Sequence, residues 1–532
     1  MQFSVSVKSV ACLLLVAGTH AQKPTTHMAT PVEHHGKAPR TAMGSLAPEQ
    51  IHLALGESPD LMRVQWATFD INCSSSETVV SYGTDKKNLL STVEGECFHF
   101  QPSSSAIAMS LHVATMTGLE ASTKYFYQVG GASSHTSKTF NFRTAPDAST
   151  LEAHLPQYFL VWGDMGSSLS GPTDSTTIMP YASVEVEAGN VDMILHVGDF
   201  GYNMNDQDGA IGSLYMNEIQ NMSAYTPYMV DPGNHEVSYN FAYYTEFFRN
   251  MPANPEHPTV TTDNGVAPNN WYFSFNMGLV HFVTLSSEIY YDYPDMAADQ
   301  WEWLKADLEA ANKNRTEAPW IIVNAHRPLY CSCDDDCDES ASTMRVGILQ
   351  SDGTRLWGLD QVFYDYGVDL FLAGHEHNYE RTYDVAPMEN SDSPWKSGYT
   401  TQSTTNPPAT THIVTGDAGN DENHETFTRR QPSRTAFRTD AYGYSRMTIH
   451  IVTGDAGNDE NHETFTRRQP SRTAFRTDAY GYSRMTIHNE SHMFWQQVEC
   501  DSSRDPVVEA TVIDEFWLIM ENHGSFNGSF TA

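Results

Sequence analysis

Two kinds of hydrophobic pattern divide the chain. Short stretches in which apolar and polar residues alternate lie between residues 48 and 146, with turn residues between them; the clearest are 50–55, 62–68, 78–82, 124–129 and 139–143. Alternation with a period of two places one face of a strand in a core and the other in solvent. The spacing of these stretches predicts a small β-sandwich over residues 48–146.

From about residue 155 the strands become continuously apolar, and each runs into a polar or glycine-containing turn. The strands expected from this pattern are 158–162, 192–197, 227–230, 320–324 and 368–372. Residues 300–312 have helical spacing instead, with Trp301, Leu304, Leu308 and Ala311 on one face. Strands that alternate with helices predict an α/β domain over residues 155–523, with functional residues in the loops beyond the strand ends.

Residues 413–450 and 451–488 are identical, so the chain contains a tandem copy of 38 residues. Repeat proteins normally have three or more diverged units. One perfect copy therefore indicates a very recent event or an error in the assembly of the sequence. Because one position in a sheet cannot hold two strands, we expect only one copy's worth of strand to pair in the sheet and the other 38 residues to be extruded as a poorly ordered insertion.

The N-terminus has the features of a signal peptide over residues 1–21. Lys8 is its only charge, residues 10–17 are apolar, and small residues at 19–21 offer a cleavage point. The apolar stretch is far shorter than the roughly 18 residues of a membrane span. Residues 22–47 are polar and without periodicity, which predicts a disordered lead-in. We therefore expect a secreted protein.

Sequons and cysteines agree with export. N-x-S/T sequons lie at Asn72, Asn221, Asn314, Asn489 and Asn527, and six cysteines follow the signal: Cys73, Cys97, Cys331, Cys333, Cys337 and Cys500. An oxidising compartment favours disulfides. Cys73 with Cys97 is the preferred pair, since both lie in the small N-terminal domain. The three cysteines at 331–337 favour a loop disulfide over a zinc site.

The net charge of −36 excludes some partners. Nucleic-acid binding needs clustered Lys and Arg, so no nucleic acid is expected, and no apolar run is long enough to predict a membrane span. The same charge repels anionic substrates. A protein that binds them needs a strong local positive charge, and metal ions are the obvious source.

Five short motifs each follow an apolar strand. They are Gly163-Asp164-Met165-Gly166, Gly198-Asp199-Phe200-Gly201-Tyr202, Gly233-Asn234-His235-Glu236, Val323-Asn324-Ala325-His326 and Gly374-His375-Glu376-His377. Singly each is a weak signal, because a strand-end Asp is often a turn former and most histidines bind no metal. Five in order, each with oxygen or imidazole donors, indicate a metal site.

The set resembles the purple acid phosphatase branch of the calcineurin-like metallophosphoesterases. The resemblance covers roughly residues 48–523; segments 442–446 and 514–518 resemble strands of that family, and 118–127 resembles the tyrosine-corner region of fibronectin type III domains. It implies an N-terminal fibronectin type III-like β-sandwich followed by an αββα-sandwich catalytic domain.

The resemblance also implies a dinuclear centre. Asp164, Tyr202 and His377 would bind one metal, Asn234, His326 and His375 the other, and Asp199 would bridge them. Phenolate and carboxylate are hard anionic ligands that suit Fe(III), whereas an amide and imidazoles suit divalent Zn, Mn or Fe. The charge left on the metals would attract the substrate.

The activity implied is that of a secreted acid phosphatase, in which a metal-bound hydroxide attacks a phosphate monoester. His235 would contact the phosphate and help to protonate the leaving group. Members of the family often carry histidines in the loop after the V-x-x-H motif, but residues 327–339 contain none, so the resemblance assigns no general acid there.

Three alternatives remain. A phosphodiesterase or nucleotide-cleaving enzyme would share the metal core, because pocket loops select the substrate. A Ser/Thr protein phosphatase fits less well, since those cytosolic relatives lack the tyrosine of the second motif. A non-catalytic secreted glycoprotein is the third, although no ligand position is missing.

Overall fold

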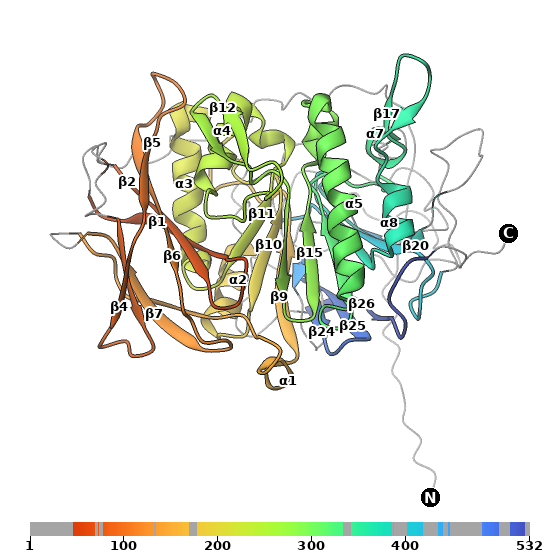
Figure 1. The fold of residues 1–532 in the computed structure, drawn as a ribbon, viewed down its shortest axis with the longest axis horizontal. Helices are drawn as coiled ribbons and strands as arrows, with labels where there is room; N and C mark the ends of the chain where they lie inside the picture. The colour runs from red at the N-terminus through yellow and green to blue at the C-terminus, as the bar shows by residue number, and fades with distance from the viewer. Residues whose placement is uncertain are drawn as a thin grey trace, which may run out of the picture.

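The computed structural model describes residues 46–69, 73, 78–131, 135–169, 178–333, 342–385, 387, 402–418, 435–439, 445–446, 481–499 and 511–526. The expected signal peptide and the lead-in up to residue 45 lie outside these residues. In this part of the chain, a β-sandwich packs beside a larger domain of two sheets flanked by helices (Figure 1). No helix among the described residues is long and apolar enough to cross a membrane.

The N-terminal domain is a sandwich of two antiparallel four-stranded sheets, as expected. The first has the order β1-β2-β6-β5, and the second β4-β3-β7-β8. The strands are β1 (Glu49–Leu55), β2 (Met62–Thr68), β3 (Val79–Gly83), β4 (Ser91–Glu94), β5 (Glu96–Phe100), β6 (Met109–Met116), β7 (Lys124–Val129) and β8 (Phe140–Arg143). The Trp66 and Tyr127 side chains are fully buried between them. Cys73 and Cys97 form a disulfide, which confirms the preferred pairing.

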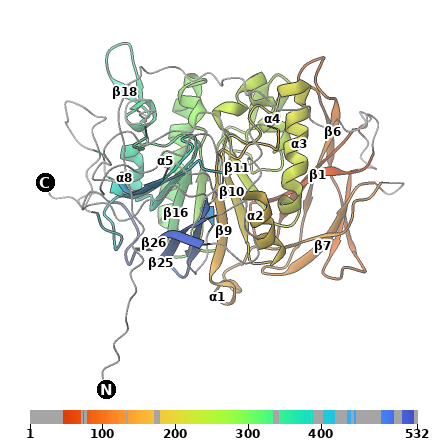
Figure 2. The same ribbon diagram turned by 180° about the vertical axis from the view of Figure 1, so that it is seen from behind.

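The first sheet of the larger domain has a parallel part and an antiparallel part. β9 (Gln157–Trp162), β10 (Met193–Val197) and β11 (Tyr228–Asp231) are parallel. β23 (Ser445–Arg446), β24 (Gly481–Ile487), β25 (His492–Glu499) and β26 (Thr511–Ile519) continue the sheet in antiparallel pairs. α2 (Ile178–Glu187) and α3 (Asp206–Ser223) lie on the side of this sheet that faces the sandwich (Figures 1 and 2).

The second sheet has the order β14-β15-β16-β19-β21-β20-β22. Its strands are β14 (Phe273–Met277), β15 (Val280–Thr284), β16 (Trp320–Asn324), β19 (Leu370–Ala373), β20 (Tyr379–Val385), β21 (Thr410–Thr415) and β22 (Thr435–Thr439). Strands β15, β16, β19 and β21 are parallel. α5 (Ala297–Lys313) and α8 (Asp360–Tyr366) flank this sheet (Figure 1).

Shorter elements complete the domain. They are α1 (Leu151–His154), α4 (Ser238–Phe247), α7 (Ser342–Arg345), the hairpin of β12 (Thr259–Thr262) with β13 (Gly265–Pro268), the hairpin of β17 (Ile348–Leu349) with β18 (Arg355–Leu356), and the 3₁₀ turns η2 (Asn234–Glu236), η3 (Ser287–Tyr290) and η4 (Pro294–Met296).

The two sheets pack face to face, which gives the expected αββα layers. The rings of Phe159 in β9 and Phe282 in β15 meet edge to face with centroids 5.5 Å apart. On α5 the buried face is shifted from the expected one, since Trp303 is buried and Trp301 is partly exposed. The Trp301 indole instead donates to the Gly358 carbonyl at 3.0 Å, which a helical projection of the sequence does not anticipate.

Polar contacts join the sandwich to the larger domain along α3. The Gln50 amide donates to the Ser213 hydroxyl at 2.9 Å, and the Gln220 side chain accepts from the Ile51 amide at 2.9 Å. The Tyr127 hydroxyl donates to the Ala224 carbonyl at 2.7 Å. The contacts of Gln50 and Tyr127 are buried and that of Gln220 is partly buried, and buried hydrogen bonds hold two surfaces in one relative position. The sandwich therefore has a packing role.

The duplicated segment contributes strands from both copies. β21 and β22 include residues of the first copy, whereas β24 comes from the second. Their counterparts at 451–453 and 473–477 lie outside the described residues. Arg446 and Arg484, which are equivalent in the two copies, are both paired with Leu160 and Gln496. Because one position in a sheet holds one strand at a time, these are alternative pairings of the same sequence, and the extrusion of 38 residues stays a prediction.

Candidate metal centre

Each of the five motifs lies immediately after a parallel strand of one of the two sheets. Asp164 follows β9, Asp199 and Tyr202 follow β10, and Asn234 follows β11. His326 follows β16 in the second sheet, and His375 and His377 follow β19. The carboxyl ends of parallel strands meet at one edge of a sheet. Because the two sheets are stacked, both edges contribute side chains to one site.

Three of the expected ligands form a first trio. The Tyr202 hydroxyl lies 2.7 Å from Nε2 of His377 and 3.0 Å from Oδ1 of Asp164. Nε2 of His377 lies 3.5 Å from the same Asp164 oxygen. All three side chains are buried. These are the residues that were expected to share one metal.

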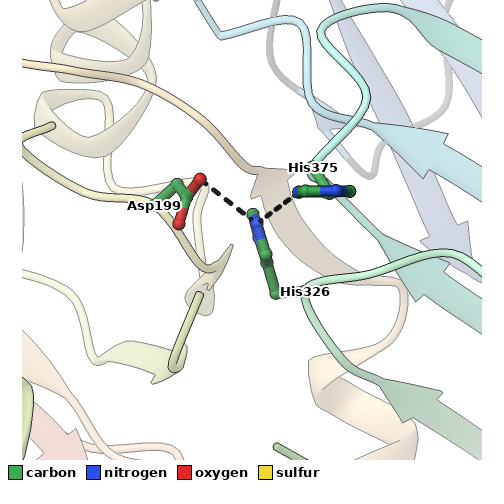
Figure 3. A group of neighbouring side chains, drawn as sticks. All are labelled: Asp199, His326 and His375. Carbon is green, nitrogen blue, oxygen red and sulfur yellow. Dashed lines mark hydrogen bonds and ion pairs between the residues drawn. The ribbon is translucent and has the colours of Figure 1, made fainter. Parts of the chain in front are cut away.

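The other expected ligands form a second group, part of which Figure 3 shows. Nε2 of His326 lies 3.1 Å from Oδ1 of Asn234, 3.2 Å from Nδ1 of His375 and 3.2 Å from Oδ2 of Asp199. Asp199, His326 and His375 each offer a ligand atom, and these atoms lie within 4.8 Å of one another. One cation could therefore contact all three.

A backbone contact joins the two groups. The His375 amide donates to Oδ2 of Asp164 at 2.8 Å, although Asp164 belongs to the first trio. All seven expected ligands thus lie around one site. Their role as metal ligands stays a prediction, as does the bridging role of Asp199.

Glycines of the motifs provide the space that this convergence needs. A Cβ on Gly233 would lie 2.1 Å from Oδ1 of Asp199, and one on Gly374 would lie 2.3 Å from Oδ2 of Asp164. A Cβ on Gly198 would lie 2.5 Å from Nδ1 of His326. Each glycine therefore admits a ligand that belongs to a different motif. This close fit, together with the hard and imidazole donors, suits a pair of metal ions.

Backbone strain is concentrated at the same positions. Asp164, Asp199, Tyr202 and His375 have φ values of 60°, 53°, 51° and 71°. Such left-handed conformations are uncommon for residues other than glycine and persist only where the surroundings impose them. Four of the seven expected ligands are thus held in unfavourable conformations, which is typical of a functional site.

Glu236 holds two of the loops together, a role that the sequence did not indicate. Its Oε2 accepts from the amides of Asp199 at 2.9 Å and Gly233 at 3.0 Å, and its Oε1 accepts from the Phe200 amide at 3.0 Å. Burial, and secondarily the charge of Asp199, raise the pKa of Glu236 to about 8. A carboxyl group that connects two loops therefore lies directly behind the expected ligands.

The electrostatics of the site favour the ionised form of Asp199. Burial by itself would raise the pKa of Asp199, but the neighbouring His326 and His235 lower it below its usual range. Nε2 of His235 lies 3.7 Å from Oδ2 of Asp199, and its Nδ1 lies 3.0 Å from Oδ1 of Asn203. His235 is therefore beside the expected ligands, and its catalytic role stays a prediction.

The loop that contains three cysteines lies behind the last motif. Cys331 is disulfide-bonded, which removes it as a zinc ligand, and a disulfide within this loop stays a prediction. The buried thiol of Cys333 donates to Oε2 of Glu376 at 2.7 Å. Cys337 and Cys500 lie outside the described residues.

Family models match most of the chain. Residues 48–144 match the purple acid phosphatase N-terminal domain, and residues 158–379 match the calcineurin-like phosphoesterases. The C-terminal domain of iron/zinc purple acid phosphatase-like proteins matches twice, at 409–450 and 447–515, and each match includes one copy of the duplicated segment.

Known proteins give the same result. Acid phosphatase type 7 of Danio rerio is 34% identical over 410 residues, which is 75% of this chain and 85% of the relative. The Homo sapiens protein of that name is 34% identical over 417 residues, covering 76% and 85%. A purple acid phosphatase from yellow lupin (Lupinus luteus) seeds shares the fold, with a TM-score of 0.62 and 20% identity over 89% of this chain and 74% of that chain. The chain therefore belongs to the purple acid phosphatase family, within the calcineurin-like phosphoesterases, and is an enzyme of the acid phosphatase class.

Proposed function

We propose that the protein hydrolyses small phosphate monoesters in acid with one Fe(III) and one divalent Zn, Mn or Fe ion. The observation that supports this most is the separation of the expected ligands into two groups of different chemistry. Tyr202, Asp164 and His377 form one group, and Asn234, His326 and His375 form the other. The relatives named acid phosphatase support the reaction class.

The donors of each group suit a different ion. A phenolate and a carboxylate are hard and anionic and favour a trivalent ion, whereas an amide oxygen and two imidazoles are neutral and favour a divalent one. When bound, the pair would supply a hydroxide nucleophile in acid and neutralise the charge of the phosphate. The protein itself, with a net charge of −36, otherwise repels such a substrate.

His235 is the side chain that we assign to the phosphate. Its ring lies against Tyr202, with centroids 4.2 Å apart, and its Nδ1 is held 3.0 Å from Asn203. The ring is therefore oriented by two neighbours beside the expected ligands. A protonated His235 would donate to a phosphoryl oxygen and transfer a proton to the leaving alkoxide.

Secretion is part of the proposal. A signal-like segment at residues 1–21, the Cys73–Cys97 disulfide and the disulfide-bonded Cys331 support it. Asn221 and Asn489, both within sequons, are exposed and accessible to glycosylation. Expression in cultured animal cells tests this directly. Glycosidase-sensitive protein in the medium is expected, and unglycosylated protein confined to the cytosol would refute it.

A comparison of two substrates tests the reaction. Turnover of an aryl phosphate monoester and of the matching diester is measured in acid with purified, metal-loaded protein. The proposal predicts a clear preference for the monoester. Preference for the diester would favour the phosphodiesterase alternative, and absence of turnover on either would favour a non-catalytic glycoprotein.

A further inference from the structure

Arg327 directly follows the expected ligand His326, and its guanidinium is held in one orientation. Its Nε and Nη2 donate to Oε1 and Oε2 of Glu288 at 2.7 Å and 2.8 Å. The guanidinium lies over the Tyr291 ring, 4.6 Å from the centroid. Its backbone amide donates to the Ser287 hydroxyl at 3.0 Å. A bidentate pair and a stacked ring fix both the position and the plane of the group.

The third nitrogen of the guanidinium is directed at the candidate metal centre. Nη1 of Arg327 lies 3.0 Å from Nε2 of His375. The other ring nitrogen of His375, Nδ1, faces His326 at 3.2 Å within the group drawn in Figure 3. Nδ1 is therefore the atom that His375 offers to a cation, and Nε2 is the atom that faces Arg327.

Once a cation is bound to Nδ1 of His375, two hydrogen-bond donors face each other: Nη1 of Arg327 and Nε2 of His375. A neutral imidazole that binds a metal through Nδ1 carries its proton on Nε2 and can only donate there. A guanidinium has donors and no acceptor. The Arg327–His375 contact then lacks an acceptor, and an anionic oxygen placed beside both groups would accept from each.

We propose that Arg327 binds a phosphoryl oxygen of the substrate through Nη1, next to Nε2 of His375. This inference rests on the phosphatase function proposed above and names, besides His235, a second side chain that recognises the ester's anionic group. Arg327 is buried and paired with Glu288, so hydrogen bonds from its remaining nitrogen Nη1 are little weakened by solvent. Residues 327–339 contain no histidine, and Arg327 is the residue of this loop that would contact the substrate.

The arginine binds rather than transfers a proton. A guanidinium is not deprotonated in proteins, so Arg327 is no proton donor to the leaving group. The Glu288 carboxylate balances most of its charge. Its contribution is therefore a directional donor held in a fixed place, Nη1, which serves a phosphate in both the ground state and the transition state.

Arg249 provides a matched control. It too pairs with a glutamate, Glu246, at 2.7 Å, and lies over an aromatic ring, Phe98, at 4.1 Å. These partners lie in α4 and β5, at the boundary between the two domains. Replacing either arginine therefore breaks a glutamate pair and removes a contact with an aromatic ring. Only Arg327 also lies next to His375.

The test is calorimetric titration of inorganic phosphate into metal-loaded protein, with metal content measured on the same samples. For Arg327→Gln we expect metal content to stay at the wild-type value and the Kd of phosphate to rise about tenfold to a hundredfold. Arg327→Lys, which keeps one charge but loses the fork, should weaken phosphate binding less. Arg249→Gln should leave the Kd unchanged.

The outcomes separate this inference from the proposed function. Unchanged phosphate affinity in Arg327→Gln at full metal content would overturn the role of Arg327, even if the wild type hydrolyses monoesters. If Arg327→Gln does not fold, Arg327→Lys is measured instead. A phosphate affinity and a KM equal to those of the wild type in Arg327→Lys would then overturn the role of Arg327. Absence of monoester turnover in the wild type would instead refute the proposed function.

Discussion

The Tyr202 hydroxyl lies 2.7 Å from Nε2 of His377, although 175 residues separate the two in the sequence. Oδ1 of Asp164 lies 3.0 Å from the same hydroxyl. Three chain segments therefore place a phenol, an imidazole and a carboxylate within contact distance of each other. Such a set has little value for stability, because its polar groups are buried and its backbone is strained. A cation shared by the three side chains, as proposed above, would account for it.

Replacing Tyr202 by Phe tests this set. If Tyr202 is the phenolate ligand of Fe(III), the Tyr202→Phe variant loses the visible absorption of the iron-loaded protein while it keeps its fold. Absorption spectra of wild type and variant, loaded with equal iron, measure the effect. Tyr244→Phe is the control, because the Tyr244 hydroxyl is buried and donates to the Asn270 carbonyl instead. An unchanged spectrum in Tyr202→Phe would exclude Tyr202 as the ligand.

Replacing Gly233 by Ala tests the close packing of the ligands. The new Cβ would lie 2.1 Å from Oδ1 and 2.6 Å from the backbone nitrogen of Asp199, so Asp199 must move. We expect a loss of bound metal and a stability loss of about 1–3 kcal/mol, as for other overpacked sites. Metal content and thermal unfolding measure the two effects.

Gly189→Ala serves as the control for Gly233→Ala. Gly189 has a φ of +74°, and no atom lies within 4 Å of a Cβ placed there. This substitution should cost about 1 kcal/mol through the backbone alone and leave the metal content unchanged. Full metal content in Gly233→Ala would show that Asp199 does not need its observed position.

His52 makes stability depend on pH in acid. Its Nδ1 lies 2.8 Å from the Gln50 carbonyl, and its buried Nε2 has no hydrogen-bond partner. Burial lowers the pKa of His52 to about 4, from 6.5 in the unfolded chain. The unfolded state therefore binds more protons between these values, so stability falls as the pH falls from 6.5 to 4, by about 3 kcal/mol in all.

Denaturant unfolding at several pH values measures this dependence. His52→Asn should reduce the loss of stability between pH 6.5 and 4, because asparagine does not titrate there. His99→Asn, at an exposed position of β5, should leave it unchanged. Equal pH dependence in wild type and His52→Asn would show that His52 is not the group responsible.

Deletion of one copy of the duplicated segment should leave a functional enzyme. Removal of 413–450 or of 451–488 produces the same sequence, because the copies are identical. Arg446 and Arg484 are both paired with Leu160 and Gln496. After the deletion a single arginine remains for these partners. The shorter connection between β22 and β24 lowers the entropic cost of closing that loop, by about 2 kcal/mol. We expect a higher melting temperature and unchanged kcat/KM; failure of the deletion variant to fold would contradict this.

Continuously apolar runs allowed the central strands to be predicted well. The strand predicted at 320–324 coincides with β16, and Asp199, Asn234 and His326 were found because each follows such a run. β6 was missed although apolar Met109, Leu111 and Val113 alternate with polar residues along it, and its polar Ser110 and His112 are buried as well. β4 was missed because it has only four residues and is mostly exposed.

Other features depend on contacts that no local pattern contains. α3 includes Gly209 and Gly212 and has no regular apolar stripe, because it is buried between the sandwich and the first sheet. Glu236 and Glu288 contact the site through loops far apart in the sequence. The direction of the Arg327 guanidinium likewise follows from Glu288 and Tyr291, which only the fold brings to it.

Metal analysis of the purified full-length protein tests the central claim most directly. Elemental analysis by mass spectrometry, combined with an independent measurement of protein concentration, gives the number of cations per chain. The seven converging side chains predict two, one of them iron, and predict that Asp199→Asn retains fewer. A wild-type protein that turns over phosphate monoesters with one cation or none would contradict the account.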